Sequence, residues 1–415
     1  MARLVLKFGG SSVAEPDRVR GVADLIARER ERGHELVVVV SAMGDATDDL
    51  IALASQVSDD PRRSHPREFD MLVSAGERIS MALLAMALRE RGAEAISLTG
   101  SQAAILTDGA HTGARIQEVR ATRVLEGLEA GRIVIVAGFQ GVSPAREVTT
   151  LGRGGSDTTA VALAAALSAE RCDIYTDVDG IYTADPRIVP SARRIDELDY
   201  EEALELANSG AKVLHPRAVE IGRRYRVPLR VLSSFGTGEE NATLIRQRER
   251  GMEELVLTGL AAEPGFAILI LCGLPEGMRS TSTVLDRLAG AGVSVDMVAQ
   301  ADREVGGRQL QLSIRDEVLP EARVVCETLI DELGADRLEV IDGLARLALV
   351  GSGMHGRPGV YARTFQALLR EGVEVYGLST SSISITLLIE AEAEERAVRA
   401  LHEAFRLGDI GEARV

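Results

Sequence analysis

The sequence predicts an α/β protein, with an N-terminal α/β/α sandwich built on a mainly parallel sheet and two smaller βα units after it. In the first half, short apolar runs alternate with helix-forming stretches, a pattern typical of parallel strands covered by helices. Several of these runs end in glycine-rich turns, where ligands of open α/β sheets bind. A polar, charged stretch at 236–253 then separates this half from a C-terminal half with an internal repeat.

Length and composition narrow the class of protein. A chain of 415 residues is long enough for two or three domains, and its hydrophobic share of 46% supplies a sizeable core. The net charge of −16 argues against a nucleic-acid or anionic-membrane partner. No signal peptide is expected, because Lys7 and the glycines after it interrupt the only apolar run near the N-terminus. The absence of a run of about 18 apolar residues also predicts no membrane span.

The cysteines and most histidines show no metal-ligand spacing. Only three cysteines are present, so we expect a reducing, cytoplasmic environment and no metal held by protein ligands alone. His215 stands beside Pro216, which suggests a turn, and the other histidines are interpreted as structural or surface residues. The cysteines are Cys172, Cys272 and Cys326, and those other histidines are His34, His65, His111, His355 and His402.

The elements of the first half follow from where each apolar or helix-forming run begins and ends. Strands are predicted where short apolar runs lie between turn residues, and helices where longer runs contain few Gly and Pro. In chain order we expect a strand at 3–8, a helix at about 16–32, a strand at 36–41, helices at about 46–57 and 68–91, strands at 94–98 and 132–137, a helix at 158–169, a strand at 173–177, helices at 199–207 and 211–225, and a strand at 227–233.

The first strand ends in a turn that can receive a phosphate. Lys7 can neutralise an anion, the glycines Gly9 and Gly10 open the backbone, and Ser11 can donate a hydrogen bond. The spacing of a P-loop is absent. Lys7 and Lys212 are the only lysines among 47 basic residues. Both lie in motif-like stretches, so we favour a requirement for a compact ammonium over survival by chance.

The glycine-rich turn at 151–157 opens the helix expected at 158–169. Free N–H groups at a helix start attract anions, and Arg153 can hold a carboxylate. Asp157 can orient Lys7, with capping of the helix as the rival interpretation. The turn is not a dinucleotide fingerprint, because the third glycine and the downstream ribose acid do not follow. An acidic turn, Asp177-Val178-Asp179-Gly180, closes the next strand and can face a metal or a cation.

Two further polar segments follow the second strand. Ser41 and Thr47 can hold a small substrate, although residues of this type often cap helices. Glu77 lies in Ser74-Ala75-Gly76-Glu77-Arg78, and a glutamate there is usually solvated. Neither segment identifies a site alone.

The C-terminal half repeats one pattern. A strand at 267–272, a helix at 281–290, Gly292-Val293-Ser294-Val295 and a strand at 308–314 form the first copy. The second copy has a strand at 346–350, a helix at 359–371, Gly372-Val373-Glu374-Val375 and a strand at 383–389. Helices at 319–333 and 393–405 complete two ferredoxin-like βαββαβ units. We see no nucleophile–base pair in this half, so we interpret it as binding rather than chemistry.

Taken together, these stretches resemble the aspartate kinases of the amino acid kinase family. The motifs that carry the resemblance are KFGGSS (7–12), SAMGDATD (41–48), SAGER (74–78), TGSQA (99–103), GFQG (138–141), TLGRGGSDTTA (150–160), TDVDGIYTADPR (176–187) and GAKVLHPRAVE (211–220), with GSGMHGRPGV (351–360) and STSSISI (379–385) resembling paired ACT domains. The resemblance implies a kinase domain at 1–248, a first ACT unit at 255–335 and a second at 336–415, with a strand near 255–262 able to pair with the second unit.

The resemblance implies ATP- and Mg²⁺-dependent phosphorylation of the L-aspartate β-carboxylate, the first step toward lysine, threonine and methionine. It assigns Lys7 and Asp157 to catalysis and Ser41, Thr47, Glu77, Arg153 and Gly154 to the aspartate site. The nucleotide site comprises Lys7, Gly9, Gly10, Ser11, Ser156, Thr176, Asp177, Tyr182, Asp185, Arg187 and Lys212. Effector binding falls to Met297, Gln300, Ser379 and Thr380, with lysine and threonine as effectors and a homodimer or homo-oligomer formed through the ACT units.

The first ACT unit departs from the family pattern. The loop before its helix reads Leu274-Pro-Glu-Gly-Met-Arg-Ser280 in place of an Asp-x-Pro-Gly-like loop, and Ala301 stands where an Asn usually follows Gln300. Weakened feedback by lysine plus threonine is therefore expected. Met252 lies where some relatives start a shorter regulatory subunit, and an ordinary linker residue is the alternative.

Two other functions remain open at this point. A sister amino acid kinase would act on glutamate, acetylglutamate, carbamate or a nucleotide, but SAGER (74–78) and the two ACT-like units argue against it. A catalytically silent amino-acid sensor would use only the ACT pair. The presence of Lys7, Glu77, Arg153 and Asp157 argues against that.

Overall fold

The computed structural model describes residues 2–211, 213–236, 241–248, 257–302, 307–354, 357 and 359–409. The chain forms two compact units, one made of Met1–Tyr182 and Arg194–Gly251, the other of Thr183–Arg193 and Met252–Val415. The backbone therefore passes from one unit to the other three times, near residues 182, 193 and 251. The sequence had indicated only the last of these passages.

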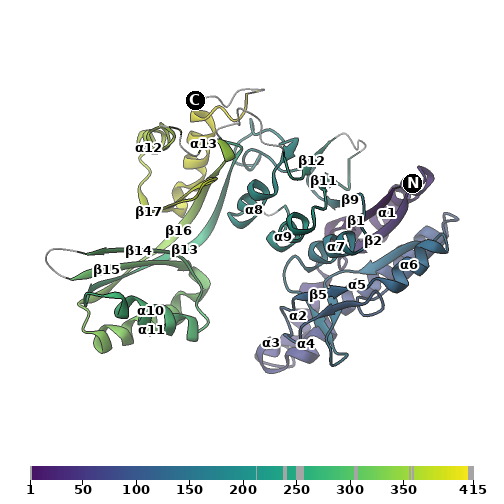
Figure 1. Cartoon of the computed structure of the whole chain (residues 1–415), viewed down its shortest axis with the longest axis horizontal. Coiled ribbons are helices and arrows are strands. Elements are labelled where there is room, and N and C mark those ends of the chain that lie inside the picture. Colours follow the sequence, from purple (N-terminus) through teal and green to yellow (C-terminus); the bar gives the residue numbers. More distant parts are fainter. Residues whose placement is uncertain are drawn as a thin grey trace. The chain divides into compact units, whose positions relative to one another are not determined.

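The first unit is built on an eight-stranded sheet with the order β10-β12-β11-β9-β1-β2-β6-β3 (Figure 1). All neighbouring strands run parallel except β11 and β12, so the predicted mainly parallel sheet is confirmed. The elements are β1 (Arg3–Phe8), α1 (Pro16–Glu31), β2 (Glu35–Val40), α2 (Ala46–Ser55), α3 (Pro61–Ser64), α4 (Pro66–Val73), α5 (Ala75–Arg89), β3 (Ala95–Leu98), β4 (Ile105–Thr107), β5 (Ile116–Val119), α6 (Thr122–Glu129), β6 (Ile133–Ala137), β7 (Gln140–Val142), β8 (Val148–Thr150), α7 (Gly155–Ala166), β9 (Arg171–Thr176), β10 (Glu197–Leu198), α8 (Tyr200–Asn208), α9 (Pro216–Tyr225), β11 (Leu229–Ser233) and β12 (Ala242–Ile245).

Side chains along β1 alternate between two faces of the sheet, so every second one enters an apolar core while Lys7 points to the opposite face. Leu4, Leu6 and Phe8 point to one face and pack in an apolar cluster with α1 and α5. Successive side chains of a strand point to opposite faces, so Lys7 points to the other face. Helix α7 packs against β1 and β9. The pattern that buries β1 thus directs its one lysine toward α7.

A second, four-stranded sheet with the order β5-β4-β7-β8 was not predicted from the sequence. Its strands are three or four residues long and mix polar with apolar side chains, so they carry little periodicity. The last of them, β8, ends at Thr150 and leads directly into the glycine-rich turn. This small sheet therefore supports the turn from its N-terminal side.

Three predicted helices have different bounds in the structure. The stretch expected as one helix at 68–91 is two helices, α4 and α5, joined at Ser74. Helix α7 begins at Gly155 rather than 158. The prediction started too late because glycine has a low helix propensity, so residue 155 was not expected to be helical. Helix α9 begins at Pro216 rather than 211, because His215 caps it and proline occupies its first position.

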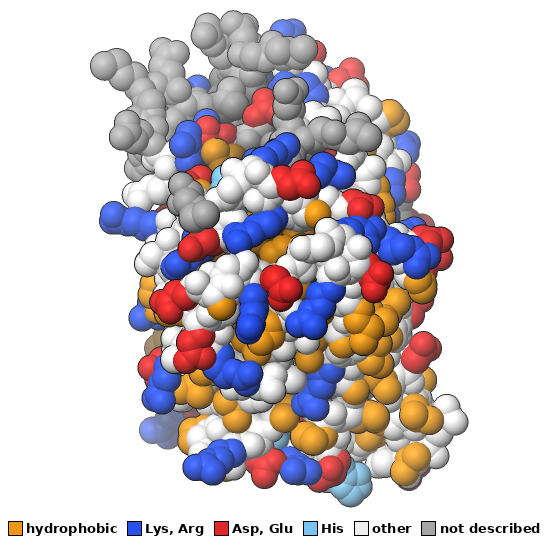
Figure 2. All heavy atoms as spheres, turned by 90° about the vertical axis from the view of Figure 1, so that its right-hand side faces the viewer, with side chains coloured by type: hydrophobic (Ala, Val, Ile, Leu, Met, Phe, Trp, Pro, Cys, Tyr) orange, Lys and Arg blue, Asp and Glu red, His pale blue; other side chains and the backbone are white. Residues whose placement is uncertain are grey.

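Helices α4 and α5 together, residues 66–89, are long and apolar enough to cross a membrane by length and composition, the one such stretch among the described residues. A core helix passes the same test. This stretch is interrupted at Ser74 and buries two carboxylates, Asp70 and Glu77, inside the first unit. On the face shown in Figure 2, acidic and basic side chains are interspersed, without a continuous basic field.

The second unit contains one antiparallel six-stranded sheet with the order β14-β15-β13-β16-β18-β17. The long strands β13 and β16 pair with each other and so join the two predicted repeats in one sheet. The Gly-Val segments at 292–293 and 372–373 precede β14 and β17. The elements are β13 (Gly259–Leu274), α10 (Met278–Gly290), β14 (Val295–Asp302), β15 (Arg308–Arg315), α11 (Leu319–Leu333), β16 (Arg337–Val350), α12 (Val360–Arg370), β17 (Val375–Thr380), β18 (Ser384–Glu390) and α13 (Glu394–Ala404).

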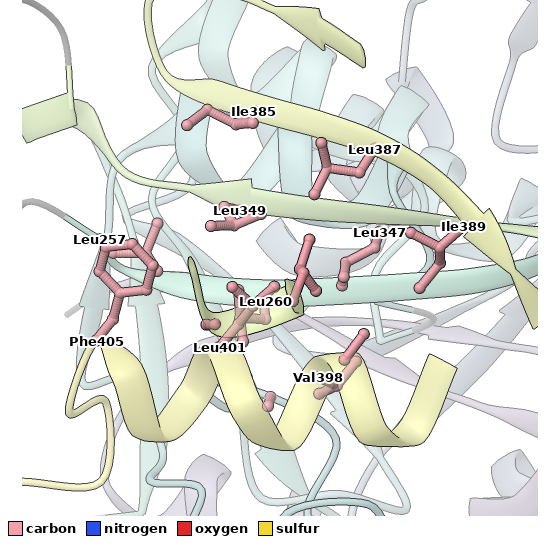
Figure 3. Packing of buried hydrophobic residues seen from close by; sticks show 14 of the residues in the cluster. Leu257, Leu260, Leu347, Leu349, Ile385, Leu387, Ile389, Val398, Leu401 and Phe405 are labelled. Carbon is pink, nitrogen blue, oxygen red and sulfur yellow. The ribbon is translucent and has the colours of Figure 1, made fainter. Parts of the chain in front are cut away.

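The core of the second repeat includes residues from the middle of the chain. Val398 and Leu401 of α13 pack against apolar side chains of β16 and β18 (Figure 3). Ala184 and Val189 belong to the same cluster, although they precede it by a large part of the sequence. Thr183 fixes this segment, since its carbonyl accepts from the Leu260 N–H at 2.8 Å. Residues 183–193 are thus an integral part of this core.

Candidate active site

A buried ion pair lies at the carboxyl end of β1. The Nζ atom of Lys7 is 2.7 Å from Oδ1 of Asp157, which lies in the first turn of α7. Both residues are at least nine-tenths buried, with exposed fractions of 8% and 9%. The residue before α7 is Gly154, and no side chain caps the helix, so Asp157 pairs with the lysine rather than capping.

The start of α7 is held close to the end of β6. A Cβ on Gly138, which follows β6, would lie 2.6 Å from Oγ of Ser156, so only glycine fits here. Ser156 is itself buried in the first turn of α7. Asp157 of the same turn contacts Lys7, so the helix start, where N–H groups favour an anion, lies beside the lysine.

The turn after β1 is tied to neighbouring strands. The Gly9 N–H donates to the carbonyl of Tyr175 in β9 at 3.2 Å, and the hydroxyls of Ser12 and Ser234 are 2.8 Å apart. A Cβ on Gly10 would lie 3.0 Å from the carbonyl of Ala42, so this turn also abuts the end of β2. Ser11 lies between these anchors in a short 3-10 turn.

Glu77 is buried beside the end of β2. Its Oε1 accepts a hydrogen bond from the Ala42 N–H at 3.2 Å, while Oε2 has no hydrogen-bond partner among the residues that the structure describes. Thr47 is also close, because its Oγ1 lies 3.9 Å from where a Cβ on Gly76 would stand. Ser41 directly precedes Ala42. The structure thus brings the segment 41–48, which contains Ser41 and Thr47, next to Glu77 of the segment 74–78.

The surroundings of Glu77 favour a positively charged partner. Burial raises the pKa of the Glu77 carboxyl to about 7, and hydrogen bonds from the backbone N–H groups of Glu77 and Ala42 oppose this only in part. A buried carboxylate with one free oxygen is stabilised by an ammonium group that enters the site. Glu77 is therefore suited to an amino group, and not to a solvated surface position.

The glycine-rich turn exposes Arg153 to solvent and packs against His215 and Arg217 on its other side. Gly154 has φ +65°, and a Cβ there would lie 2.1 Å from Cγ of His215, so the turn packs on the histidine ring. The guanidinium of Arg217 donates to the carbonyls of Leu151 at 2.5 Å and Ala114 at 3.0 Å. Arg153 itself is exposed and free to meet a carboxylate ligand.

His215 is neutral in this setting. Burial lowers the pKa of its imidazole, with Asp157 opposing the shift, and its Nδ1 accepts a hydrogen bond from the Arg217 N–H at 3.3 Å. The proton then lies on Nε2, which can donate but carries no charge. His215 supports the turn without adding a cation to it.

The predicted nucleotide residues fall into two groups. Thr176 ends β9 and donates a hydrogen bond of 3.1 Å to Asp177, the next residue. Tyr182 donates to Asp179 at 2.8 Å, and all four residues belong to the first unit. Asp185 and Arg187 belong to the second unit and pair with each other at 2.6 Å. Lys212 lies outside the described residues.

The described part of the chain contains no group of three or more His, Cys, Asp and Glu side chains that could hold a metal ion. The side chains near Lys7 therefore do not fit an ion held by the protein alone. An ion that arrives on a nucleotide would be bound mainly by the phosphates.

The predicted effector residues lie on two strands that are not hydrogen-bonded neighbours, although Met297 and Tyr376 of β17 pack against one apolar cluster and the Gln311 side chain of β15 donates to the Tyr376 carbonyl at 3.0 Å. Met297 and Gln300 lie on β14, while Ser379 and Thr380 lie on β17, and these are the two edge strands of the six-stranded sheet. Gln300 accepts a hydrogen bond from Thr281 of α10 at 2.8 Å. The Met297 N–H donates to Ser313 at 2.9 Å.

Sequence reasoning missed four residues that support the site. Asp70, Gln140 and Arg217 hold a turn or a helix start through hydrogen bonds to residues distant in the chain, whereas His215 caps α9 locally and packs its ring against Gly154. Gln140, for example, donates to the carbonyl of Ser74 at 2.9 Å, where α4 meets α5. Gln140, His215 and Arg217 lie inside motifs of the family resemblance, and this position was the only sequence feature that could have indicated their role.

Comparisons with known proteins agree with this geometry. The profile of the amino acid kinase family matches residues 2–233, and that of an ACT domain matches residues 347–405. An aspartokinase of Geobacillus stearothermophilus is 47% identical over 99% of this chain and 98% of its own. E. coli aspartokinase III in complex with aspartate and ADP is similar at a TM-score of 0.81 and 30% identity, over 97% of this chain and 99% of that one. The same enzyme in complex with lysine and aspartate has a TM-score of 0.73 at 30% identity, over 96% and 98%.

Proposed function

This chain belongs to the aspartokinases of the amino acid kinase family, and we propose that its Lys7–Asp157 site transfers the γ-phosphoryl group of ATP to the side-chain carboxylate of L-aspartate. The buried Lys7–Asp157 pair at the start of α7 is the observation that carries this assignment. The product is an acyl phosphate, 4-phospho-L-aspartate, together with ADP. This reaction opens amino-acid biosynthesis toward lysine, threonine and methionine.

The chemistry needs positioning more than proton transfer. One oxygen of the ionised carboxylate attacks the γ-phosphorus, and the bond to the oxygen that bridges the β- and γ-phosphates breaks. A carboxylate is already a nucleophile at neutral pH, so no general base is required. Lys7 neutralises charge that builds up on the transferred group, and Asp157 keeps the ammonium in place. The N–H groups at the start of α7 add further donors.

The substrate is held by its charged ends. Glu77 receives the α-ammonium group, since its Oε2 is buried without a hydrogen-bond partner among the residues that the structure describes. Arg153 receives a carboxylate from the exposed side of the glycine-rich turn. Mg²⁺ enters with ATP as the complexed nucleotide, and no residue of this chain is assigned to hold it. Thr176, Asp177, Tyr182, Asp185, Arg187 and Lys212 are proposed for the nucleotide.

The test is a hydroxamate assay, in which hydroxylamine traps the acyl phosphate. We expect ATP-dependent hydroxamate with L-aspartate and much less with L-glutamate, N-acetylglutamate or carbamate. Product with another acid and none with aspartate would identify a sister kinase. No product with any of them would identify an amino-acid sensor.

Regulation is proposed to act through the ACT units. Met297 and Gln300 of β14 and Ser379 and Thr380 of β17 are proposed to bind an amino-acid effector, and a second copy of the chain is proposed to associate through the ACT units. E. coli aspartokinase III has been captured with lysine, which supports an amino-acid effector here. Met252 is outside the described residues, so an internal start stays a prediction. A smaller product from the native gene, beginning at Met252, would support it.

Inhibition by lysine plus threonine is expected to be weak. The loop at 274–280 lacks the usual aspartate, and Gln300 is already engaged by Thr281. The measurement is hydroxamate formation at subsaturating aspartate with each amino acid alone and with both together. Strong concerted inhibition at physiological concentrations would show that the altered loop still binds its effectors.

A further inference from the structure

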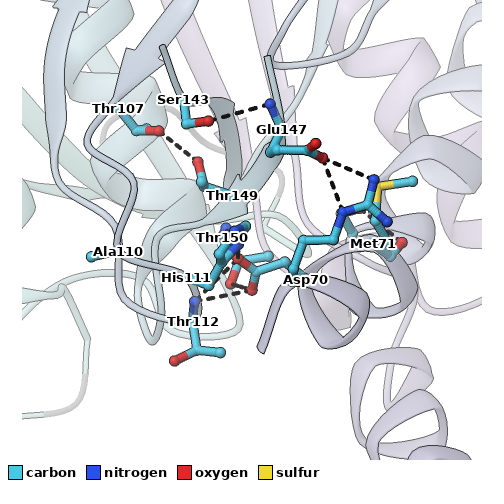
Figure 4. Close-up of polar contacts among 12 residues, drawn as sticks. Asp70, Met71, Thr107, Ala110, His111, Thr112, Ser143, Glu147, Thr149 and Thr150 are labelled. Carbon is cyan, nitrogen blue, oxygen red and sulfur yellow. Dashed lines mark hydrogen bonds and ion pairs between the residues drawn. The ribbon is translucent and has the colours of Figure 1, made fainter. Parts of the chain in front are cut away.

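A buried carboxylate outside the catalytic pair holds the glycine-rich turn in place. Asp70 of α4 is fully buried, with an exposed fraction of 0%. Four donors converge on it from two distant segments, as Figure 4 shows. It accepts from the backbone N–H of Thr112 at 3.1 Å, from the N–H of Thr150 at 3.1 Å and from the Thr150 hydroxyl at 2.6 Å. Nδ1 of His111 lies 2.7 Å away.

These contacts flank the turn on both sides. Thr150 is the residue directly before the glycine-rich turn and lies three positions ahead of Arg153. The carbonyl of Thr112 lies 3.4 Å from where a Cβ on Gly152 would stand, so the segment after β4 packs against the turn itself. Asp70 therefore hydrogen-bonds both to Thr150, which leads into the turn, and to Thr112, in the loop against which the turn packs.

Asp70 is also linked to the other side of the aspartate site. Helix α4 continues into α5 through Ser74, and Glu77 stands in the first turn of α5. The α4–α5 junction is fixed by Gln140, whose side chain donates to the Ser74 carbonyl. Two consecutive helices, joined at Ser74, thus carry Asp70 and Glu77.

We infer that Asp70 is a positioning residue that sets the separation between Glu77 and Arg153, and thereby the fit of the amino-acid substrate. This inference rests on the proposed roles of Glu77 and Arg153 in binding aspartate. An apolar side chain would fill the space under the turn, but only an acceptor with several lone pairs can fix both Thr150 and Thr112. A buried carboxylate without such a task would be destabilising.

The test compares isosteric variants of the full-length enzyme. Asp70→Asn exchanges one acceptor oxygen for a donor and is expected to raise KM for aspartate roughly ten- to a hundredfold, with KM for ATP changed less than about twofold. Thr150→Val removes the hydroxyl donor and is expected to act in the same direction. Thr150→Ser keeps the hydroxyl and is expected to restore a KM close to that of the wild type. The increase in KM for aspartate in the double variant Asp70→Asn/Thr150→Val is expected to be smaller than the two single effects combined. Both changes disrupt the same hydrogen bond, from the Thr150 hydroxyl to Asp70.

Thr107→Val is the matched control. Thr107 lies in the same small sheet, is fully buried, and its hydroxyl pairs with that of Thr149 at 2.6 Å without contacting the turn. It should lower the melting temperature without changing KM for aspartate. Equal changes in both KM values and kcat, in step with loss of stability, would reduce Asp70 to a structural role. An unchanged KM for aspartate in both Asp70→Asn and Thr150→Val would overturn the inference. A wild-type enzyme that does not turn over aspartate would refute the proposed function instead.

Discussion

Replacing Lys7 by arginine is expected to lower kcat about a hundred- to a thousandfold, although the positive charge is kept. Lys7 is buried, and its Nζ is 2.7 Å from Asp157. A guanidinium is larger and planar, so it cannot occupy this space and still direct a hydrogen bond toward a phosphoryl group. The measurement is steady-state hydroxamate formation with both substrates varied, together with a thermal melt.

Two further variants separate charge from shape. Arg3→Lys is the control, because Arg3 lies on the same strand, pairs with Glu35 at 2.8 Å and undergoes the reverse exchange away from the site. It should keep wild-type turnover. Asp157→Asn should lower kcat with KM for aspartate little changed, since it leaves Lys7 without its anchor. Near-native turnover of a folded Lys7→Arg enzyme would disprove the proposed requirement for an ammonium.

Replacing Glu77 by glutamine is expected to raise KM for aspartate about a hundredfold while making the free enzyme more stable at pH 8. The carboxylate is buried, and one of its oxygens has no partner among the described residues. The unpaired charge lowers the stability of the substrate-free protein and favours binding of the substrate ammonium. Glutamine has the same shape without the charge. KM for ATP should remain unchanged, and calorimetry of the substrate-free enzyme measures the gain in stability.

The direction of the pH dependence follows from the raised pKa. The Glu77 carboxyl titrates near pH 7 in the folded protein and near 4.5 in the unfolded chain. Between these values the folded state binds the proton more tightly, so the free energy of unfolding decreases as pH rises from about 4.5 through 7. The advantage of Glu77→Gln should be absent at pH 4.5, grow across this window and level off above pH 7 at about 3 kcal/mol.

The same titration affects substrate binding in the wild type. Below pH 7 Glu77 takes up a proton and cannot pair with an ammonium, so KM for aspartate should rise as the pH falls. Glu90→Gln is the control, because Glu90 ends the same helix and is exposed. It should change neither stability nor KM. A Glu77→Gln enzyme with wild-type KM for aspartate would show that the ammonium is bound elsewhere.

The strands with uniform apolar character were predictable from the sequence, and the short mixed ones were not. The run at 3–8 matches β1 to the residue, because Leu, Val and Phe dominate it and the glycine pair after it marks its end. Strands β4 and β7 consist of three residues each, and their pairing depends on tertiary contacts. The break at Ser74 was also hidden, since the helical periodicity continues across it and Gln140 fixes the junction from a distant strand.

The catalytic residues of the site could be predicted from the sequence, whereas the residues that hold the surrounding turns in place could not. Lys7 and Asp157 are separated by most of the first unit, yet both stand in glycine-rich turns at strand or helix ends, and the fold places such turns on one edge of the sheet. Asp70 gave no comparable signal. An aspartate in an amphipathic helix is usually solvated, and only the fold brings Thr112 and Thr150 to it.

The incorporation of residues 183–193 into the second unit sets a rule for building hybrid enzymes. Ala184 and Val189 complete a core whose other members follow residue 256. A hybrid in which only the segment after residue 251 comes from another enzyme would pack Ala184 and Val189 against the core of that other enzyme. The regulatory half must therefore be exchanged as a pair of segments, 183–193 together with 252–415. Hybrids recombined at a single crossover point would contain few folded members.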